Sequence, residues 1–188
     1  MPGPIMPIGA SGGGVVIPVG TVNGADFTDL AVNWRSTATH NSGSKFCLSM
    51  DEGSTTLGVV AYARASDGYF CAQVVTFDSA GVPSLGTELL ITATAYAANV
   101  FCAVMSSTKV AFAVVDSGGT LRCKRATISG TSLTSLSAEY TATGFYSGQS
   151  GSGSFRKFDT NWAMYMGPSS TSNNMRGCGF DTTTPAMG

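Results

Sequence analysis

The sequence predicts an all-β fold. Side chains alternate between apolar and polar with the period of two that is typical of a strand, as in Lys109–Val115. The candidate strands are rich in Val, Thr, Phe and Tyr, and Ser, Thr, Gly, Asn or Asp separates them. The stretch from Gly86 to Gly130 shows this most clearly, in four runs: Glu88–Ala93, Val100–Met105, Lys109–Val115 and Leu121–Ile128.

The same pattern occurs three times. Thr-Ala-Thr stands at 37–39, 92–94 and 141–143, spaced by 55 and 49 residues. Phe-Cys stands at 46–47 and 101–102, and Phe155 follows 54 residues later. A period of about 50 residues with four short strands per unit is typical of a propeller blade. We therefore expect an N-terminal arm over residues 1–25 and three blade-like repeats over residues 26–188.

The remaining strands follow the same order in each repeat. A second strand is predicted at Leu57–Ala65, Val110–Val115 and Trp162–Met166, and a third at Phe70–Phe77, Leu121–Ile128 and Met175–Phe180. Glu139–Thr143 alternates as the last Thr-Ala-Thr strand. Turn residues separate second and third strands at Ser66–Gly68, Asp116–Gly119 and Gly167–Ser170.

The two ends of this order predict an oligomer. The chain opens with a Thr-Ala-Thr strand near Thr28–Thr39 that has no repeat of its own, and it closes with a repeat that lacks a fourth strand. Three blades are too few to close a ring, since propellers have at least about four. We expect a homo-oligomer, most simply two chains that form a six-bladed ring. The alternative is an intertwined β-rich trimer.

The first 25 residues differ from the rest. Pro2, Pro4 and Pro7 and the run Gly12–Gly14 exclude a helix and favour an extended segment. Its start is neither basic nor continuously apolar, which does not fit a secretory signal. Its apolar residues would be buried if the segment anchored the protein in a groove of a neighbouring subunit; the alternative is a flexible leader. These anchoring residues are Ile5, Met6, Ile8, Val15, Val16 and Ile17.

Composition narrows the class of protein. Charged residues make up 11% of the 188 residues, less than half of the usual ~25%, whereas hydrophobic residues reach 43%. A net charge of −1 provides no field that would attract nucleic acid. No apolar run approaches the ~20 residues of a membrane helix. Polar but uncharged surfaces of this kind favour an extracellular or virion protein.

The five cysteines, Cys47, Cys71, Cys102, Cys123 and Cys178, show no CxxC spacing and thus no zinc or redox motif. Four lie in apolar or alternating runs, where we expect buried free thiols. The alternative is disulfides between neighbouring strands or chains.

Catalytic motifs are missing from the sequence. His40 is the single histidine and lies in the polar turn THNSGS, which gives little support for Ser–His or Cys–His catalysis. Most carboxylates lie in turns, where Asp bonds to its own following backbone. No P-loop, EF-hand or HExxH motif occurs. We expect a protein that is not an enzyme and that binds no metal and no cofactor.

Aromatic residues offer a second functional hypothesis. Sugars commonly stack on exposed rings, and several rings stand near strand ends or in loops. The candidates for glycan binding are Tyr96, Tyr146, Trp34 and Trp162. The alternative is that these rings pack in the core or between repeats.

Two stretches resemble known repeats. Ser49–Thr56 (SMDEGSTT) resembles the Asp-box of sialidase-type propellers, with Thr56 in the aromatic position; in that family the box is a structural turn. Ser106–Thr134 is similar to repeats of bacteriophage tail-fibre and other virion proteins. The second resemblance implies a structural component of a phage virion, made in the host cytoplasm, with other virion proteins and a host-surface glycan as partners. A small oligomeric propeller lectin is the alternative.

Overall fold

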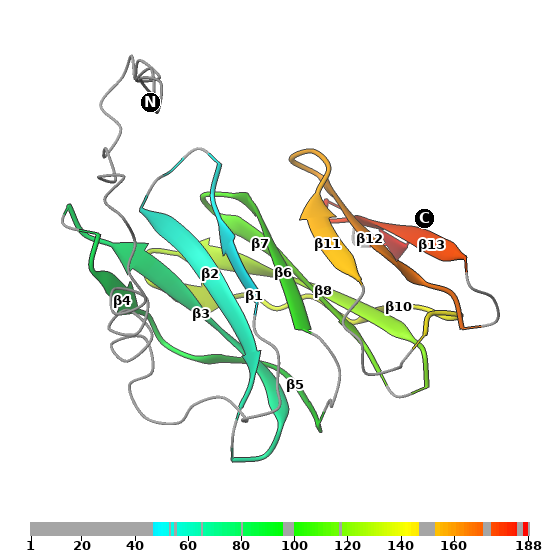
Figure 1. Ribbon diagram of the computed structural model, residues 1–188. Helices are drawn as coiled ribbons and strands as arrows, with labels where there is room; N and C mark the ends of the chain where they lie inside the picture. The colour runs from blue at the N-terminus through cyan, green and yellow to red at the C-terminus, as the bar shows by residue number, and fades with distance from the viewer. Residues whose placement is uncertain are drawn as a thin grey trace, which may run out of the picture.

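The computed structural model describes residues 47–187 except 53, 55, 65, 80, 96–99, 117, 147–152, 171–173, 184 and 185. The regular secondary structure of these residues consists of β-strands in three antiparallel sheets, which pack face to face in a row (Figure 1). The predicted all-β class is thus confirmed. No helix that could span a membrane occurs in this part of the chain. The predicted arm and the strand near Thr28–Thr39 lie outside the described residues.

In each sheet the first three strands form an antiparallel meander in chain order. The first sheet contains β1 (Cys47–Met50), β2 (Leu57–Ala63), β3 (Tyr69–Phe77), β4 (Pro83–Leu85) and β5 (Leu89–Ala95). The second contains β6 (Val100–Ser106), β7 (Lys109–Val115), β8 (Leu121–Ser129), β9 (Ser132–Thr134) and β10 (Tyr140–Ala142). The third contains β11 (Ser154–Lys157), β12 (Trp162–Pro168), β13 (Met175–Asp181) and β14 (Ala186–Met187).

The first two sheets share one further detail of topology. The edge of β3 pairs with β4 near one end and with β5 near the other, and β8 pairs in the same way with β9 and β10. The Thr-Ala-Thr strand therefore joins the sheet of the strands that precede it in the chain. The described strands do not close into a barrel.

The turn between the first and second strand is built alike in each sheet. The Oγ of Ser54 accepts a hydrogen bond from the amide of Thr56 (3.2 Å), and Ser106 accepts one from Thr108 (3.3 Å). In the third sheet Asp159 takes this place and accepts from the amide of Asn161 at 2.6 Å. Short polar side chains that bond to the backbone two residues on favour such turns. The described residues of the Asp-box-like stretch that follow β1 thus lie in a structural turn.

In the third sheet β14 pairs with the end of β13 (Phe180↔Met187, Asp181↔Ala186), as β4 and β9 do with β3 and β8. Among the described residues no strand pairs with the start of β13 as β5 and β10 pair with β3 and β8, so the missing fourth strand stays a prediction. Another prediction about this sheet was wrong. A turn was expected over Gly167–Ser170, but β12 continues through Pro168. Proline is tolerated at this strand end because its missing N–H is not needed there, while its carbonyl accepts from the amide of Tyr146 at 2.9 Å.

The two larger core layers lie one on each face of the second sheet, and a smaller cluster of Val60, Tyr62 and Cys71 lies in the first sheet. Alternate residues of β7 face opposite ways: Val110 and Phe112 pack on the first sheet, and Ala111 and Ala113 on the third. The rings of Phe70 and Phe112 meet edge to face across the first layer, with centroids 5.9 Å apart. The second sheet is thus buried on both faces, whereas the third has a partner within the described residues on one face.

Candidate functional site

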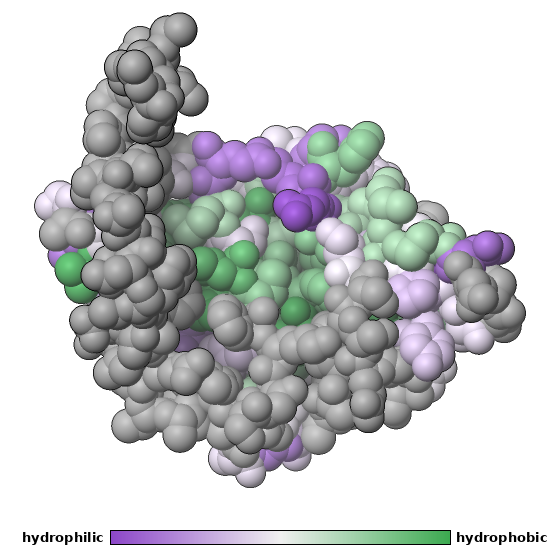
Figure 2. All heavy atoms as spheres, in the orientation of Figure 1, coloured by the Kyte–Doolittle hydropathy of each residue, from purple (hydrophilic) through white to green (hydrophobic). Residues whose placement is uncertain are grey.

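One face of the third sheet carries exposed apolar side chains. Along β12 burial alternates strictly: Ala163 and Tyr165 are buried against the second sheet, and the residues between them point away from it. On β13, Gly177 and Gly179 are paired with Met166 and Met164 and add no side chains of their own. The resulting open face consists of Trp162, Met164, Met166 and Met175, which are 38%, 39%, 46% and 59% exposed. Figure 2 shows apolar residues at the surface in this part of the molecule.

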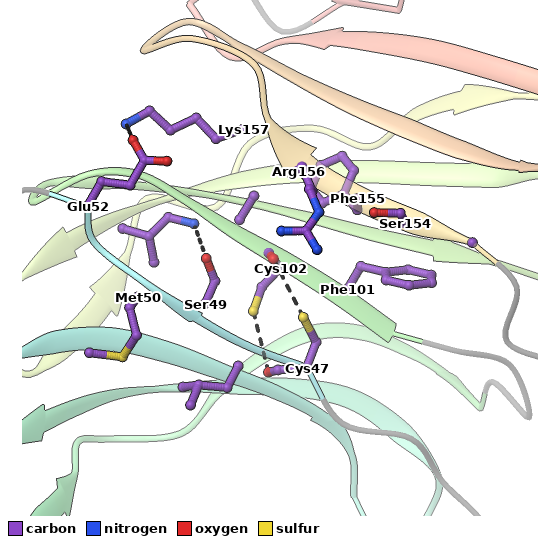
Figure 3. Close-up of a pocket in the computed structure, with 14 residues that line it drawn as sticks. Cys47, Ser49, Met50, Glu52, Phe101, Cys102, Ser154, Phe155, Arg156 and Lys157 are labelled. Atoms are coloured by element: carbon purple, nitrogen blue, oxygen red, sulfur yellow. Dashed lines mark hydrogen bonds and ion pairs between the residues drawn. The ribbon is translucent and has the colours of Figure 1, made fainter. Parts of the chain in front are cut away.

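A second feature lies where the first strands of the three sheets meet. β1, β6 and β11 line a pocket of about 450 Å³, with Cys47, Cys102 and Arg156 among its residues (Figure 3). At its edge the Nζ of Lys157 bonds to Glu52 Oε2 at 3.0 Å. β1 and β6 belong to different sheets and meet through side chains: Ser49 Oγ accepts from the amide of Val104 at 3.0 Å. We call this space the thiol pocket.

The two thiols in this pocket contact each other's strand. Cys47 Sγ lies 3.6 Å from the carbonyl oxygen of Cys102, and Cys102 Sγ lies 3.5 Å from that of Cys47. A hydrogen bond from the Cys102 thiol is the main cause that lowers the pKa of Cys47 to about 7; burial opposes it, and the charge of Arg156 contributes. Burial raises the pKa of Cys102 well above its usual value.

No protein-family model matches this chain, and no curated protein matches it either. Its function is therefore inferred from its own sheets and side chains.

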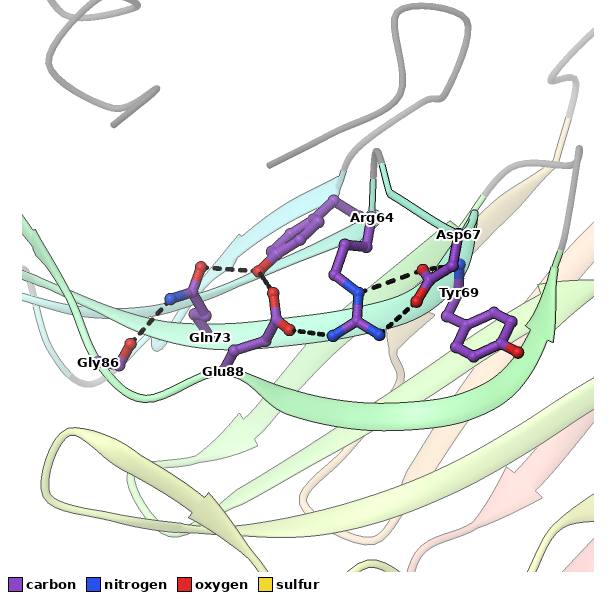
Figure 4. A network of polar contacts seen from close by, with 7 residues as sticks. Arg64, Asp67, Tyr69, Gln73, Gly86 and Glu88 are labelled. Atoms are coloured by element: carbon purple, nitrogen blue, oxygen red, sulfur yellow. Dashed lines mark hydrogen bonds and ion pairs between the residues drawn. The ribbon is translucent and has the colours of Figure 1, made fainter. Parts of the chain in front are cut away.

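A polar network covers part of the first sheet (Figure 4). The Arg64 guanidinium binds Asp67, and it also binds Glu88 at 2.8 Å. The bond between Arg64 and Asp67 holds the pKa of Asp67 below its usual range. The hydroxyl of Tyr62 donates to Glu88 and lies 2.8 Å from Gln73 Oε1. Burial, followed by the bond to Glu88, raises the pKa of Tyr62, so this phenol stays protonated.

A corresponding pair of contacts occurs in the second sheet. Arg122 donates to Asp116 at 2.8 Å and also binds Glu139. Glu88 precedes β5 and Glu139 precedes β10, and Asp67 and Asp116 each lie in the turn before the third strand of their sheet. An arginine that joins this turn to the start of β5 or β10 is a repeated structural device. These carboxylates are therefore engaged by arginine in both sheets.

The two predicted glycan-binding residues that the structure describes, Trp162 and Tyr146, do not lie close together. Trp34 and Tyr96 lie outside the described residues. Trp162 begins β12, whereas Tyr146, which is 52% exposed, bonds to Pro168 at the other end of that strand. A seven-residue strand spans about 20 Å, so these two rings are far apart. The apolar residues of the arm, Ile5 to Ile17, also lie outside the described residues.

The cysteines agree with the expected free thiols. Cys71, Cys102, Cys123 and Cys178 are buried and Cys47 is half-buried, and all five are reduced. Within the described residues no group of His, Cys, Asp or Glu side chains is arranged to hold a metal ion.

Sequence reasoning missed the thiol pocket, although a signal for it was present. The residue after the repeated phenylalanine is Cys47 in the first repeat, Cys102 in the second and Arg156 in the third. All three line the pocket. The repeat aligned these positions, but their meeting depends on how the three sheets pack together.

Proposed function

We propose that this chain is a non-enzymatic structural subunit that assembles with further copies of itself, and that the open face of the third sheet is its assembly surface. The observation that carries this proposal is the row of exposed apolar side chains on β12 and β13. The resemblance of Ser106–Thr134 to virion repeats supports placing the assembly in a phage particle, with a role in host attachment.

The succession of sheets indicates what would cover the open face. The first sheet packs on one face of the second, and the third sheet packs on the other. The open face continues this series, because it is the side of the third sheet that points away from the second. A sheet from another copy of the chain would bury it as the internal sheets bury one another.

The chemistry of the open face suits such a partner. A fully buried apolar side chain contributes about 1.5–3 kcal/mol, so covering side chains that are about half exposed contributes roughly 1 kcal/mol each. Large exposed apolar patches mark interaction surfaces more often than inert surface. Methionine adapts its shape to a partner because it is unbranched, and three of the four residues are methionines.

The proposed assembly is a propeller ring. Three antiparallel sheets packed face to face correspond to three blades, fewer than the about four that a ring needs. A second copy would raise the number to six. The intertwined trimer remains the alternative architecture, and the molar mass in solution distinguishes two chains from three.

The experiment compares two charge substitutions in the full chain. Met164→Asp places a carboxylate in the open face, and Val82→Asp places one at an exposed apolar residue of the first sheet. We expect wild type and Val82→Asp to sediment as the same oligomer, and Met164→Asp as a folded monomer with unchanged circular dichroism. A monomeric wild type, or an unaffected Met164→Asp oligomer, would contradict the proposal.

The arm has a separate role in this proposal. Residues 1–25 anchor the oligomer to other virion proteins through Ile5, Met6, Ile8, Val15, Val16 and Ile17. A variant in which serine replaces Ile5, Met6 and Ile8 should still form the oligomer but should be absent from purified particles. Particles that still contain the variant in normal amount would rule out the anchor.

One observation favours glycan binding as the alternative function, in which a sugar and not a second copy covers Trp162. The indole of Trp162 is partly exposed beside Gly179, which leaves an accessible ring on a flat sheet surface. A glycan array with wild type and Trp162→Ala tests this idea. Binding that is lost in Trp162→Ala would support a lectin, and an array without any bound glycan would exclude the tested sugars.

A further inference from the structure

The thiol pocket brings together two cysteines that are 55 residues apart in the chain and belong to different sheets. Each sulfur lies within 3.6 Å of the other residue's carbonyl oxygen. Such reciprocal contacts require the two residues to face each other across β1 and β6.

The two thiols differ in access. Cys47 is half-buried at the edge of the pocket, whereas Cys102 is only 2% exposed and bonds at 3.3 Å to the carbonyl oxygen of Val59. A small reagent in the pocket would therefore reach Cys47 first. In redox pairs the accessible thiol commonly attacks the oxidant, and the buried thiol then resolves the product.

The charges around the pocket favour a thiolate at Cys47. Arg156 extends into the pocket from β11, and its charge helps to lower the pKa of Cys47. Lys157 and Glu52, the other charged residues that line the pocket, bind each other. The net positive charge near the sulfur thus comes from Arg156, and thiolates are the reactive form of cysteine.

We propose that Cys47 and Cys102 are a reversible redox pair that cross-links the first sheet to the second, with hydroperoxides as oxidants. The Cys47 thiolate attacks the terminal oxygen of the hydroperoxide, and the O–O bond breaks. Cys47 becomes a sulfenic acid, and an alkoxide leaves, or hydroxide when the oxidant is hydrogen peroxide. The Cys102 sulfur then attacks the Cys47 sulfur. An S–S bond forms, and the Cys102 proton and the sulfenic hydroxyl leave as water. Two added thiols reverse the reaction by disulfide exchange.

The other three cysteines provide matched controls. Cys123 and Cys178 lie in the same core layer between the second and third sheets, and Cys71 is buried in the first sheet. Burial raises the pKa of all three. Cys123 and Cys178 are therefore a second pair of buried thiols within one core layer of the same molecule.

The test exposes the reduced full-length chain to a slight excess of hydrogen peroxide, blocks free thiols with iodoacetamide, and maps the peptides by mass spectrometry. We expect a Cys47–Cys102 linked peptide as the main product, lost after dithiothreitol. Cys123→Ser should still form it, whereas Cys47→Ser should form no disulfide at this dose. A Cys123–Cys178 peptide that appears first, or Cys47 that accumulates as sulfinic acid, would overturn the proposal.

A second measurement does not depend on any variant that could fail to fold. Iodoacetamide alone should alkylate Cys47 of the wild type at least about tenfold faster than the other cysteines at pH 7, because thiolate fraction and access both favour it. The rate should rise with a midpoint near pH 7. Equal labelling of all five cysteines, or a midpoint above about 8.5, the value of a free thiol, would overturn the proposal.

Discussion

The indole of Trp162 lies over Gly179 on the neighbouring strand of the third sheet. A β carbon built on Gly179 would lie 3.2 Å from Cζ3 and 3.3 Å from Cε3 of that ring. Gly179 is paired with Met164, which is on the same open face. The glycine thus lets the large ring lie close to the sheet, and the face stays flat enough to meet another sheet.

Gly179→Ala should move the indole and weaken assembly. The added methyl group is closer to the ring than ordinary contact allows, so we expect altered tryptophan fluorescence and a several-fold rise in the dissociation constant. Gly177→Ala is the matched control, because its β carbon would have nothing nearer than the carbonyl oxygen of Tyr165 at 3.9 Å. Equal effects of the two substitutions would show that the position of the indole does not matter.

Gly119→Ala should destabilise the second sheet. Gly119 has φ +75°, which favours glycine, and a β carbon there would collide with the backbone carbonyl of Phe145. Gly81 has a similar φ of +78° but open space around it. In urea unfolding, Gly81→Ala should lower the free energy of unfolding by about 1 kcal/mol, and Gly119→Ala by clearly more. Matching losses would mean that the backbone shifts freely at Gly119.

Phe112→Ala should break the contact between the first and second sheets. Phe112 is fully buried and meets Phe70 edge to face in the core layer. Removing a buried phenylalanine side chain costs about 3–5 kcal/mol of unfolding free energy. Leu90→Ala, at an exposed position of β5, should cost less than about 1 kcal/mol. Chemical denaturation of both variants measures the difference, and comparable losses would argue against this core.

Stability should fall as the pH rises above about 8.5. Burial raises the pKa of Cys71 to about 12 and also raises those of Cys102, Cys123 and Cys178. The unfolded chain releases these protons from about pH 8.5, whereas the folded chain keeps them, so alkali favours unfolding.

The effect of Cys47 on the pH dependence of stability has the opposite sign, because folding lowers the pKa of Cys47 to about 7. It adds stability as the pH rises from about 7 to 8.5. Urea midpoints should therefore rise slightly over this window and decline by pH 10. Cys47→Ser should remove the rise in urea midpoint and leave the decline by pH 10 in place. A rise of the same size in this variant would contradict the lowered pKa of Cys47.

The alternation of apolar and polar side chains was sufficient to predict most strands, but not the shortest strand or the exact strand ends. Lys109–Val115 was predicted with the observed bounds because its alternation is strict and Ser, Thr and Asp flank it. The sequence does not predict the two-residue strand β14, because this strand is too short to show a period. The end of β12 was misplaced because Pro168 reads as a turn residue, while its carbonyl is in fact held by Tyr146.

The candidate sites depend on packing between sheets. Cys47, Cys102 and Arg156 could be aligned by the repeat, but only the arrangement of β1, β6 and β11 brings them to one pocket. Trp162 was singled out from the sequence as an aromatic candidate. Its neighbours Met164 and Met166 were read as ordinary strand residues, because alternation does not tell which face will meet another sheet.

Methionine oxidation tests the assembly surface most directly. After brief exposure of the full chain to peroxide, mass spectrometry reports sulfoxide at each methionine, with the buried Met105 as an internal reference. We predict that Met166 and Met175 oxidise several-fold more slowly in wild type at high concentration than in the Met164→Asp variant. Equal rates in both proteins would show that the open face stays uncovered and would contradict the proposed assembly.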